Sequence, residues 1–261
     1  MYWWDGHPNF GDALTPWVLA RYGIVAVHAP LSRARVVGIG SLVDQLPDEF
    51  AGVIWGSGLL REAERRLPAA TALAVRGPLT RERLGLDDGV ALGDPGLLIG
   101  RHVRRRTPQW PLGVVPHGLH HADPVLRELG RRRGVRVVDV RSTPSVVMEQ
   151  ISRCAAVVTT SLHGLIVADA LGIPAAWARR RPPLWGDDFK FRDYEAVVSP
   201  GRSREIDIQR DLRPAEIVRV CGRPDARAVE AATTAIEATI ADLPAVPSSI
   251  WAEHLTRRRK N

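Results

Sequence analysis

The chain has 261 residues, 45% of them hydrophobic, and a formal net charge of +7, which suits one large α/β domain or two small ones. No apolar run is long enough for a membrane span and no signal-peptide pattern opens the chain, so the sequence predicts a cytoplasmic protein. Cys154 and Cys221 are the only cysteines. Two cysteines make neither a disulfide framework nor a zinc site, and we expect each to pack as a small apolar residue.

Arginine supplies nearly all of the positive charge, since Lys190 and Lys260 are the only lysines. A basic chain raises the question of nucleic-acid binding. The arginine clusters lie at element ends and in loops, however, and few aromatic residues accompany them. We therefore expect no nucleic-acid partner. Most clusters are interpreted as solvated faces, with a role for some in attracting an anionic substrate or a membrane surface.

The first hundred residues alternate short apolar runs with helical patterns. Strands are predicted at residues 2–4, 36–39, 53–55 and 71–75, with helices at 15–23 and 78–85. Asn9, Gly11 and Asp12 lie at the first strand-to-helix connection. These residues either form a turn for backbone reasons or contact a ligand.

Three further candidate residues follow strands of this first half. Gly58 lies in a glycine- and serine-rich turn, where backbone N–H groups can face a ligand. Arg76 ends the strand at 71–75 and precedes Gly-Pro, which directs a cation into a turn at the edge of the sheet. Asp94 precedes a proline and should be extended or in a turn. It either caps the next turn or orients a hydroxyl or a basic residue.

Residues 101–111 are polar, basic and bounded by proline, so we place a domain boundary there. The predicted sub-domains are residues 1–105 and 106–261, with the C-terminal helix packing back on the first. The second half repeats the alternation, with strands at 112–115, 135–140 and 174–178 and helices at 124–132, 144–152, 213–217, 228–243 and 250–259. His117, His120 and His121 cluster without a carboxylate or cysteine at metal-ligand spacing, so no metal site is predicted.

The segment from Val157 to Ala175 is the most informative stretch. A β-branched run at 157–160 predicts a buried strand, and Ser161 is placed to cap the helix that follows. His163 therefore lies at the carboxyl end of a strand, where open α/β sheets bind ligands and a helix N-terminus favours an anion. Gly164 leaves room for the close approach of a ligand or of a neighbouring element.

Four motifs in order resemble the polysaccharide pyruvyl transferase family. They are N-F-G-D at 9–12, V-R-G-P-x-T at 75–80, G-D-P-G-L-L at 93–98, and S-L-H-G through G-I-P at 161–174. The opening Y-W-W-D-G-x-x-N-F-G-D-A-L-x-P is most similar to the branch that decorates bacterial exopolysaccharides such as succinoglycan. The resemblance implies an α/β fold with two Rossmann-like sub-domains facing a cleft, as in GT-B glycosyltransferases.

The resemblance also implies a reaction, in which a 1-carboxyvinyl unit passes from phosphoenolpyruvate to a sugar and closes as a pyruvate ketal. Phosphoenolpyruvate is the co-substrate, and neither a metal nor another cofactor is expected. His163 is the expected general acid, and Asp12 and Asp94 are expected to orient the acceptor hydroxyl. The expected substrate contacts are Arg76, Asn9, Gly11, Ser161, Leu162, Gly164, His117 and Gly58.

Two other functions stay open from the residues alone. A GT-B glycosyltransferase would need a carboxylate for the ribose hydroxyls of a nucleotide sugar, and Glu149 and Asp169 are available. A non-catalytic basic protein would bind a polyanion through salt-sensitive contacts. The acceptor sugar and its carrier, lipid or nucleotide, also stay open. The basic C-terminus is compatible with peripheral association at the inner face of the membrane.

Overall fold

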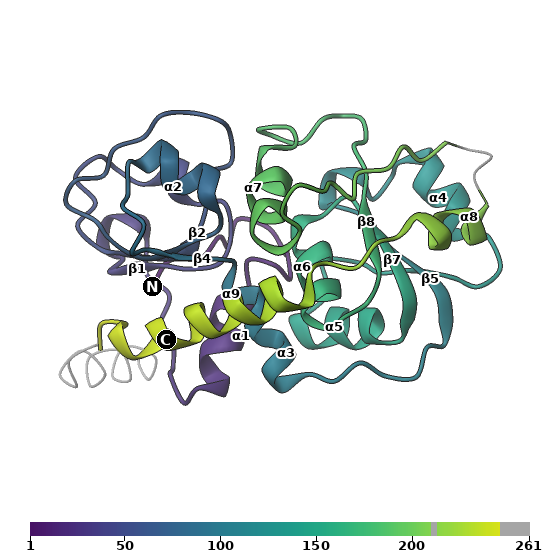
Figure 1. Ribbon diagram of the computed structural model, residues 1–261, viewed down its shortest axis with the longest axis horizontal. Helices are drawn as coiled ribbons and strands as arrows, with labels where there is room; N and C mark the ends of the chain where they lie inside the picture. Colours follow the sequence, from purple (N-terminus) through teal and green to yellow (C-terminus); the bar gives the residue numbers. More distant parts are fainter. Residues whose placement is uncertain (210–212, 246–261) are drawn as a thin grey trace, which may run out of the picture.

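A computed structural model describes residues 1–209 and 213–245, so the helix predicted at 250–259 lies outside the described residues. Two four-stranded parallel sheets organise the fold (Figure 1). The first has the order β1 (Val36–Val37), β2 (Val53–Ser57), β3 (Thr71–Val75), β4 (Ala91–Leu92). The second has the order β6 (Val135–Val137), β5 (Trp110–Val115), β7 (Cys154–Thr159), β8 (Ala175–Trp177). The predicted α/β class is confirmed.

Seven of the nine helices in the described residues lie where local signals predict a helix, whereas α3 (Ile99–His102) and α7 (Phe189–Val198) were not predicted. The seven are α1 (Leu14–Arg21), α2 (Pro78–Leu84), α4 (Pro124–Gly130), α5 (Pro144–Ser152), α6 (Leu162–Ala170), α8 (Pro214–Val220) and α9 (Ala226–Ala238). Four of them, α2, α4, α5 and α8, have proline as their first residue. Proline suits that position because its missing N–H has no intrahelical partner there. Gly85 ends α2 in the left-handed conformation, at φ 66°.

Several predicted boundaries were wrong. Tyr2 makes a single bridge to Val37 rather than starting a strand. The predicted linker at 101–111 is partly regular, because α3 runs to His102 and β5 starts at Trp110. The irregular loop expected at 179–190 ends early, since Phe189 and Lys190 form the first turn of α7. The last shift matters most, because it places Lys190 on a helix.

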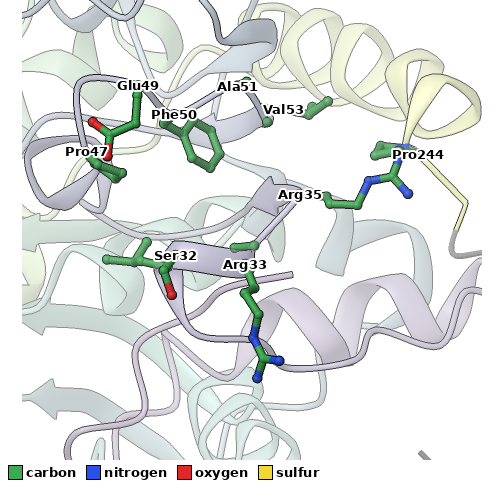
Figure 2. A pocket seen from close by; sticks show the side chains of 12 residues that line it. Ser32, Arg33, Arg35, Pro47, Glu49, Phe50, Ala51, Val53 and Pro244 are labelled. Atoms are coloured by element: carbon green, nitrogen blue, oxygen red, sulfur yellow. The ribbon is translucent and has the colours of Figure 1, made fainter. Parts of the chain in front are cut away.

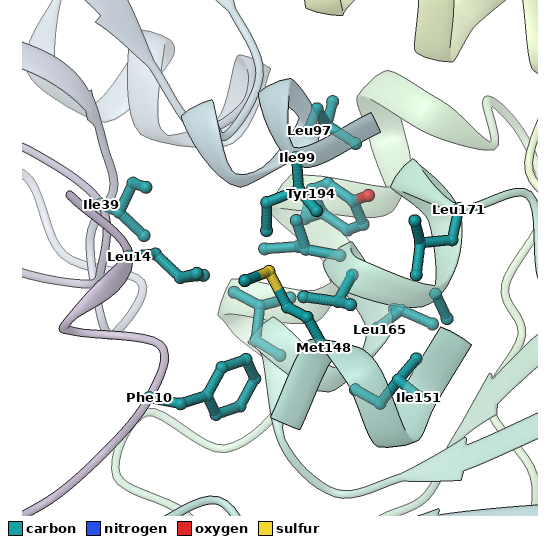
Figure 3. Packing of buried hydrophobic residues seen from close by; sticks show 14 of the residues in the cluster. Phe10, Leu14, Ile39, Leu97, Ile99, Met148, Ile151, Leu165, Leu171 and Tyr194 are labelled. Atoms are coloured by element: carbon teal, nitrogen blue, oxygen red, sulfur yellow. The ribbon is translucent and has the colours of Figure 1, made fainter. Parts of the chain in front are cut away.

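One hydrophobic cluster runs through both halves of the chain. Figure 3 shows Phe10, Leu14 and Ile39 of the first half on one side of this cluster and Met148 and Leu165 of the second half on the other. Helix α6 is buried from Leu162 to Asp169, which is typical of a helix that is apolar all round. The N-terminus of α6 is in contact with the first half, because the His163 ring lies against Gly11.

Helices α6, α7 and α9 of the second half pack against the first half, α6 through α3 and the short 3₁₀ helix at Pro95–Leu98. Helix α7 packs against α2, and α9 packs against β4 and the same 3₁₀ helix (Figure 1). Trp55 donates a hydrogen bond of 3.0 Å to Thr239 just after α9, and Tyr22 donates one of 2.7 Å to Glu237. In the part of the chain that the structure describes, no helix is both long and apolar enough to cross a bilayer.

Candidate active site

His163 lies in the first turn of α6, directly after β7. Ser161 occupies the N-cap position, but its side chain makes no capping hydrogen bond, contrary to the predicted cap. The Thr159 hydroxyl instead accepts a hydrogen bond of 2.9 Å from the Ser161 N–H and shapes the turn. The N–H groups of the first helical turn are therefore left without a side-chain cap, which is the arrangement that attracts anions.

The imidazole of His163 is buried, and one of its nitrogens lacks a hydrogen-bond partner in the described part of the chain. Its exposed fraction is 8%, and Nε2 has no hydrogen-bond partner among the described residues. Burial lowers the pKa of His163 to about 3, and the positive charges of Lys190 and Arg76 act in the same direction. The ring is therefore neutral at pH 7 while no anion is bound.

The loop Asn9–Asp12 lies against His163. A Cβ at Gly11 would overlap the His163 ring, so only glycine allows this approach. The loop is held in place by a hydrogen bond of 2.8 Å from the Phe10 N–H to the Val140 carbonyl, and the Asn9 side chain accepts one of 3.1 Å from the Gly11 N–H. The folded chain thus brings the N-F-G-D motif at 9–12 into contact with the S-L-H-G motif at 161–164.

Asp12 is the carboxyl group of this loop. Burial raises its pKa to about 7, although the charge of Lys190 and a hydrogen bond with Asn9 act against the shift. A carboxyl group with a pKa near 7 can both accept and release a proton at neutral pH, as a general base requires.

Lys190 is a site residue that the sequence motifs did not indicate. It is 8% exposed on the first turn of α7, and among residues 1–209 and 213–245 no carboxylate lies within ion-pairing distance of its amine. Burial lowers its pKa to about 8, Arg76 lowers it further, and Asp12 opposes the shift. One signal was available: Lys190 is one of two lysines in a chain that otherwise uses arginine.

A hollow of about 450 Å³ opens beside Lys190 and is lined from both halves of the chain. Its lining includes His7, Leu60, His117, Arg141, Trp185 and Lys190, and no acidic side chain among the described residues. Trp185 is 81% exposed at its edge. A Cβ at Gly186 would overlap the Leu60 carbonyl, so this loop lies directly on the first half. The volume suits a small ligand.

His117 enters the hollow from the turn after β5. Its backbone N–H donates to the Thr160 hydroxyl at 2.8 Å, and its ring nitrogen accepts from the Leu119 N–H at 3.2 Å. Burial lowers the pKa of His117 to about 3, with a further contribution from Lys190. His117 is therefore also neutral at pH 7.

Arg76 does not line the hollow. Its side chain is fully buried and donates to Asp193 at 3.0 Å, to Ser41 at 2.7 Å and to the Leu59 carbonyl at 2.5 Å. Gly58 is the residue on which the guanidinium packs, since a Cβ there would overlap it. The direct substrate contacts expected of Arg76 and Gly58 stay predictions, and the charge of Arg76 is already balanced by Asp193.

Asp94 takes the capping role among its two alternatives. One carboxylate oxygen accepts a hydrogen bond of 2.8 Å from the Gly96 N–H, and the other has no partner among the described residues. The side chain is fully buried, and burial raises its pKa to about 7. A direct contact between Asp94 and an acceptor hydroxyl stays a prediction.

Leu162 and Gly164 serve the packing of α6. Leu162 belongs to the hydrophobic cluster. A Cβ at Gly164 would overlap the side chains of Thr159 and Val115, so the neighbouring element, and not a ligand, fills the space that the glycine leaves. A contact between their backbone N–H groups and a ligand stays a prediction.

A second and larger hollow, of about 670 Å³, lies in the first half between Phe50, Arg33, Arg35 and Pro244 (Figure 2). None of the candidate site residues lines it. Its size alone is therefore no argument for the chemistry. His117 and Lys190 line the hollow of about 450 Å³, whereas His163 and Asp12 do not line it but feel the charge of Lys190. We therefore place the candidate site at that hollow.

The chain matches the family "Polysaccharide pyruvyl transferase" over residues 36–180, more than half of its length, and it belongs to that family. It is 25% identical over 215 residues to the succinoglycan biosynthesis protein ExoV of Rhizobium meliloti (strain 1021), covering 76% of this chain and 64% of that protein. It is 33% identical over 164 residues to the uncharacterized protein L143 of Acanthamoeba polyphaga mimivirus, covering 58% of this chain and 56% of that protein. The alignments thus span less than two thirds of either relative.

The two carboxylates considered for a nucleotide-sugar site, Asp169 and Glu149, are each paired with an arginine. Asp169 is buried and accepts hydrogen bonds from Arg204 at 2.5 and 2.9 Å and from Tyr194 at 2.9 Å. Glu149 pairs with Arg153 one turn along α5. Asp169 is therefore not free to bind ribose hydroxyls, whereas Glu149 is half-exposed and pairs through one oxygen only.

Proposed function

We propose that the protein transfers a pyruvyl group from phosphoenolpyruvate to a sugar of a polysaccharide or of its precursor. The observation that carries the proposal is the contact between Gly11 and His163. It joins the Asn9–Asp12 loop to the N-terminus of α6 in a chain of the polysaccharide pyruvyl transferase family. Membership of that family and the similarity to a succinoglycan biosynthesis protein support the substrate class.

The chemistry has three steps. The C3 carbon of the enol gains a proton, which makes C2 electrophilic. A sugar hydroxyl then adds to C2 and gives up its proton. The bond between C2 and the phosphate oxygen then breaks and phosphate leaves. A second hydroxyl adds to C2 to close the ketal, and its proton goes to the departing phosphate, which leaves as hydrogen phosphate. Such a site needs an acid, a base and groups that hold the anionic donor.

His163 and Asp12 take the acid and base roles in this proposal. The neutral His163 must gain a proton before it can act as an acid. A bound phosphate and carboxylate supply negative charge, which raises the pKa of a neighbouring histidine. Asp12, with its pKa near 7, is suited to receive the hydroxyl proton. The first turn of α6, with Ser161, Leu162 and Gly164, offers N–H groups to the anion.

Three other predicted residues have a supporting role in this proposal and do not contact the substrate. We propose that Arg76, with Gly58, and Asp94 are positioning residues, because each is buried and bonded within the protein. We also propose a GT-B-like arrangement with a division near residue 105, supported by the two parallel sheets. The proposal includes no metal or further cofactor, and it leaves the carrier of the acceptor and an association with the membrane surface as hypotheses.

The test is phosphate release from phosphoenolpyruvate with a panel of pyranose acceptors. We expect acceptor-dependent release by the wild type and its loss, by roughly a hundredfold or more, in His163→Ala, with circular dichroism unchanged. Arg219→Ala, which removes an exposed side chain on α8, serves as the surface control and should keep the wild-type rate. Release by His163→Ala at the wild-type rate would remove His163 from the chemistry. Thermal stabilisation by nucleotide sugars but not by phosphoenolpyruvate would instead favour a glycosyltransferase.

A further inference from the structure

Lys190 is a buried cation without a partner of opposite charge. Its side chain is 8% exposed, and within the described residues no acidic group lies within 4.0 Å of its amine. Taking an ammonium group out of water costs free energy unless a counter-charge compensates it. A folded protein retains such a group at a cost in stability, and the described residues supply no ion pair that offsets it.

Arg76, a second buried cation near Lys190, differs from it because Arg76 is paired with a carboxylate. Lys190 and Asp193 are three residues apart on α7 and therefore lie on the same face of the helix. Asp193 binds Arg76 and the Thr80 hydroxyl, the latter at 2.6 Å, and both Asp193 and Arg76 are fully buried. Helix α7 thus pairs one cation of the first half with Asp193 and adds a second cation that it does not pair.

Other charged groups around Lys190 do not neutralise its positive charge. Asp12 acts on Lys190 from beyond ion-pairing distance, and its own pKa of about 7 leaves it only partly ionised at neutral pH. The charge of Lys190 lowers the pKa of both His163 and His117, so both rings feel its field. The wall of the hollow also contains Arg141, which pairs with Asp139 at 2.7 Å, and no carboxylate among the described residues.

We propose that Lys190 binds an anionic group of the donor, its phosphate or its carboxylate, within this hollow. This inference rests on the proposed function, and it adds a donor-binding residue that no sequence motif indicated. Lys190 lines the hollow from α7 and His117 lines it from the turn after β5, so a ligand there is contacted from two elements. The packing of α7 on α2 holds Lys190 in place.

Thermal stability distinguishes an anion-binding role of Lys190 from a structural role. Replacing a lysine that stabilises the fold lowers the thermal midpoint. A lysine retained for an anion leaves the ligand-free protein as stable or more stable when methionine takes its place, because the unpaired charge is removed and the aliphatic stem is kept. Affinity for the anion should fall in the same variant.

The experiment compares Lys190→Met, Lys190→Arg and the matched control Arg127→Met, which removes an exposed cation on α4. Calorimetric titrations with phosphoenolpyruvate and with inorganic phosphate give dissociation constants, and thermal unfolding gives stability. We expect Lys190→Met to weaken phosphoenolpyruvate binding by roughly tenfold or more without lowering the thermal midpoint. Lys190→Arg should lose less, and Arg127→Met should bind within about twofold of the wild type.

The outcomes separate this inference from the proposed function. Wild-type affinity in Lys190→Met, or a lowered thermal midpoint with unchanged affinity, overturns the role of Lys190. Binding of phosphoenolpyruvate without phosphate release, for any acceptor, overturns the proposed reaction and leaves the assignment of Lys190 to be decided by the titrations. A wild type that binds neither probe overturns both. If Lys190→Met does not fold, Lys190→Gln provides the same comparison.

Discussion

Burial controls the protonation of the ionisable side chains around the N-terminus of α6. The pKa values of His163 and His117 are lowered to about 3, and those of Asp12 and Asp94 are raised to about 7. In each case burial is the largest cause, because it disfavours the charged form. The ligand-free site therefore holds neutral histidines and partly protonated carboxyl groups, and a bound anion would redistribute these protons.

Asp94→Asn tests this effect of burial through stability. The folded wild type keeps the Asp94 proton up to a pKa of about 7, whereas the unfolded chain releases it near 3.8, so wild-type stability falls as pH rises from about 4 to 7. Asparagine preserves the cap on Gly96 and removes the ionisation. We expect no stability difference at pH 4 and a gain on the order of 4 kcal/mol for the variant above pH 7.

Urea unfolding across this pH range measures the difference. The exposed Asp207→Asn is the control and should track the wild type throughout. A gap between Asp94→Asn and the wild type that stays constant with pH would show that the Asp94 carboxyl group is not destabilised by burial in the folded protein.

Among the elements, the loop at 9–12 and helix α6 depend on each other through a glycine. No space for a Cβ exists between Gly11 and the His163 ring, and the same is true of Gly164 and the sheet beneath it. The first glycine sets the distance from the loop to the helix, and the second sets the distance from the helix to β7 and β5. Together they position the His163 ring beside the loop that carries Asp12.

Gly11→Ala therefore displaces the histidine or the loop. We expect pyruvyl transfer to fall by roughly tenfold or more, with a loss of stability of about 1–3 kcal/mol from overpacking. The control is Gly222→Ala, where the nearest atoms lie 3.5 Å from an added Cβ and no displacement is needed. Phosphate release and thermal unfolding, measured on both variants, distinguish the two effects. Full activity in Gly11→Ala would show that the site tolerates a shift of His163.

Across the whole molecule, the two halves share one hydrophobic cluster and several polar contacts. The Arg76–Asp193 pair, the hydrogen bond from Trp17 to Ser145 and the pairing of Arg101 with Glu230 all join residues of the first half to residues of the second. The hollow lined by His117 and Lys190 also has walls from both halves. The site therefore requires the assembled molecule.

Separate expression of residues 1–105 and 106–261 tests how independent the halves are. Because the shared cluster and α9 would lose their partners, we expect neither fragment to unfold cooperatively, whereas the full chain unfolds in a single transition. Urea titration followed by circular dichroism measures this. A cooperative transition in either fragment, at the midpoint of the full chain, would contradict the expectation and identify an autonomous domain.

Local signals accounted for most elements of the fold. The strand at 71–75, the helix starting at Pro78 and the helix at 144–152 have the predicted bounds, since proline, glycine and apolar periodicity act on neighbouring residues. The turn between β7 and α6 that carries His163 was predicted for the same reason. Lys190 was missed because its burial arises from the contact of α7 with the first half, which leaves no pattern in the adjacent residues.

The order of residues thus specifies where strands and helices begin, which family the chain belongs to, and that His163 follows a strand. It does not specify which charges are compensated. Arg76 and Lys190 are both cations at the edge of an element, yet folding pairs Arg76 with Asp193 and leaves Lys190 facing the hollow. Backbone preferences are local, whereas burial and charge compensation depend on contacts between segments far apart in the chain.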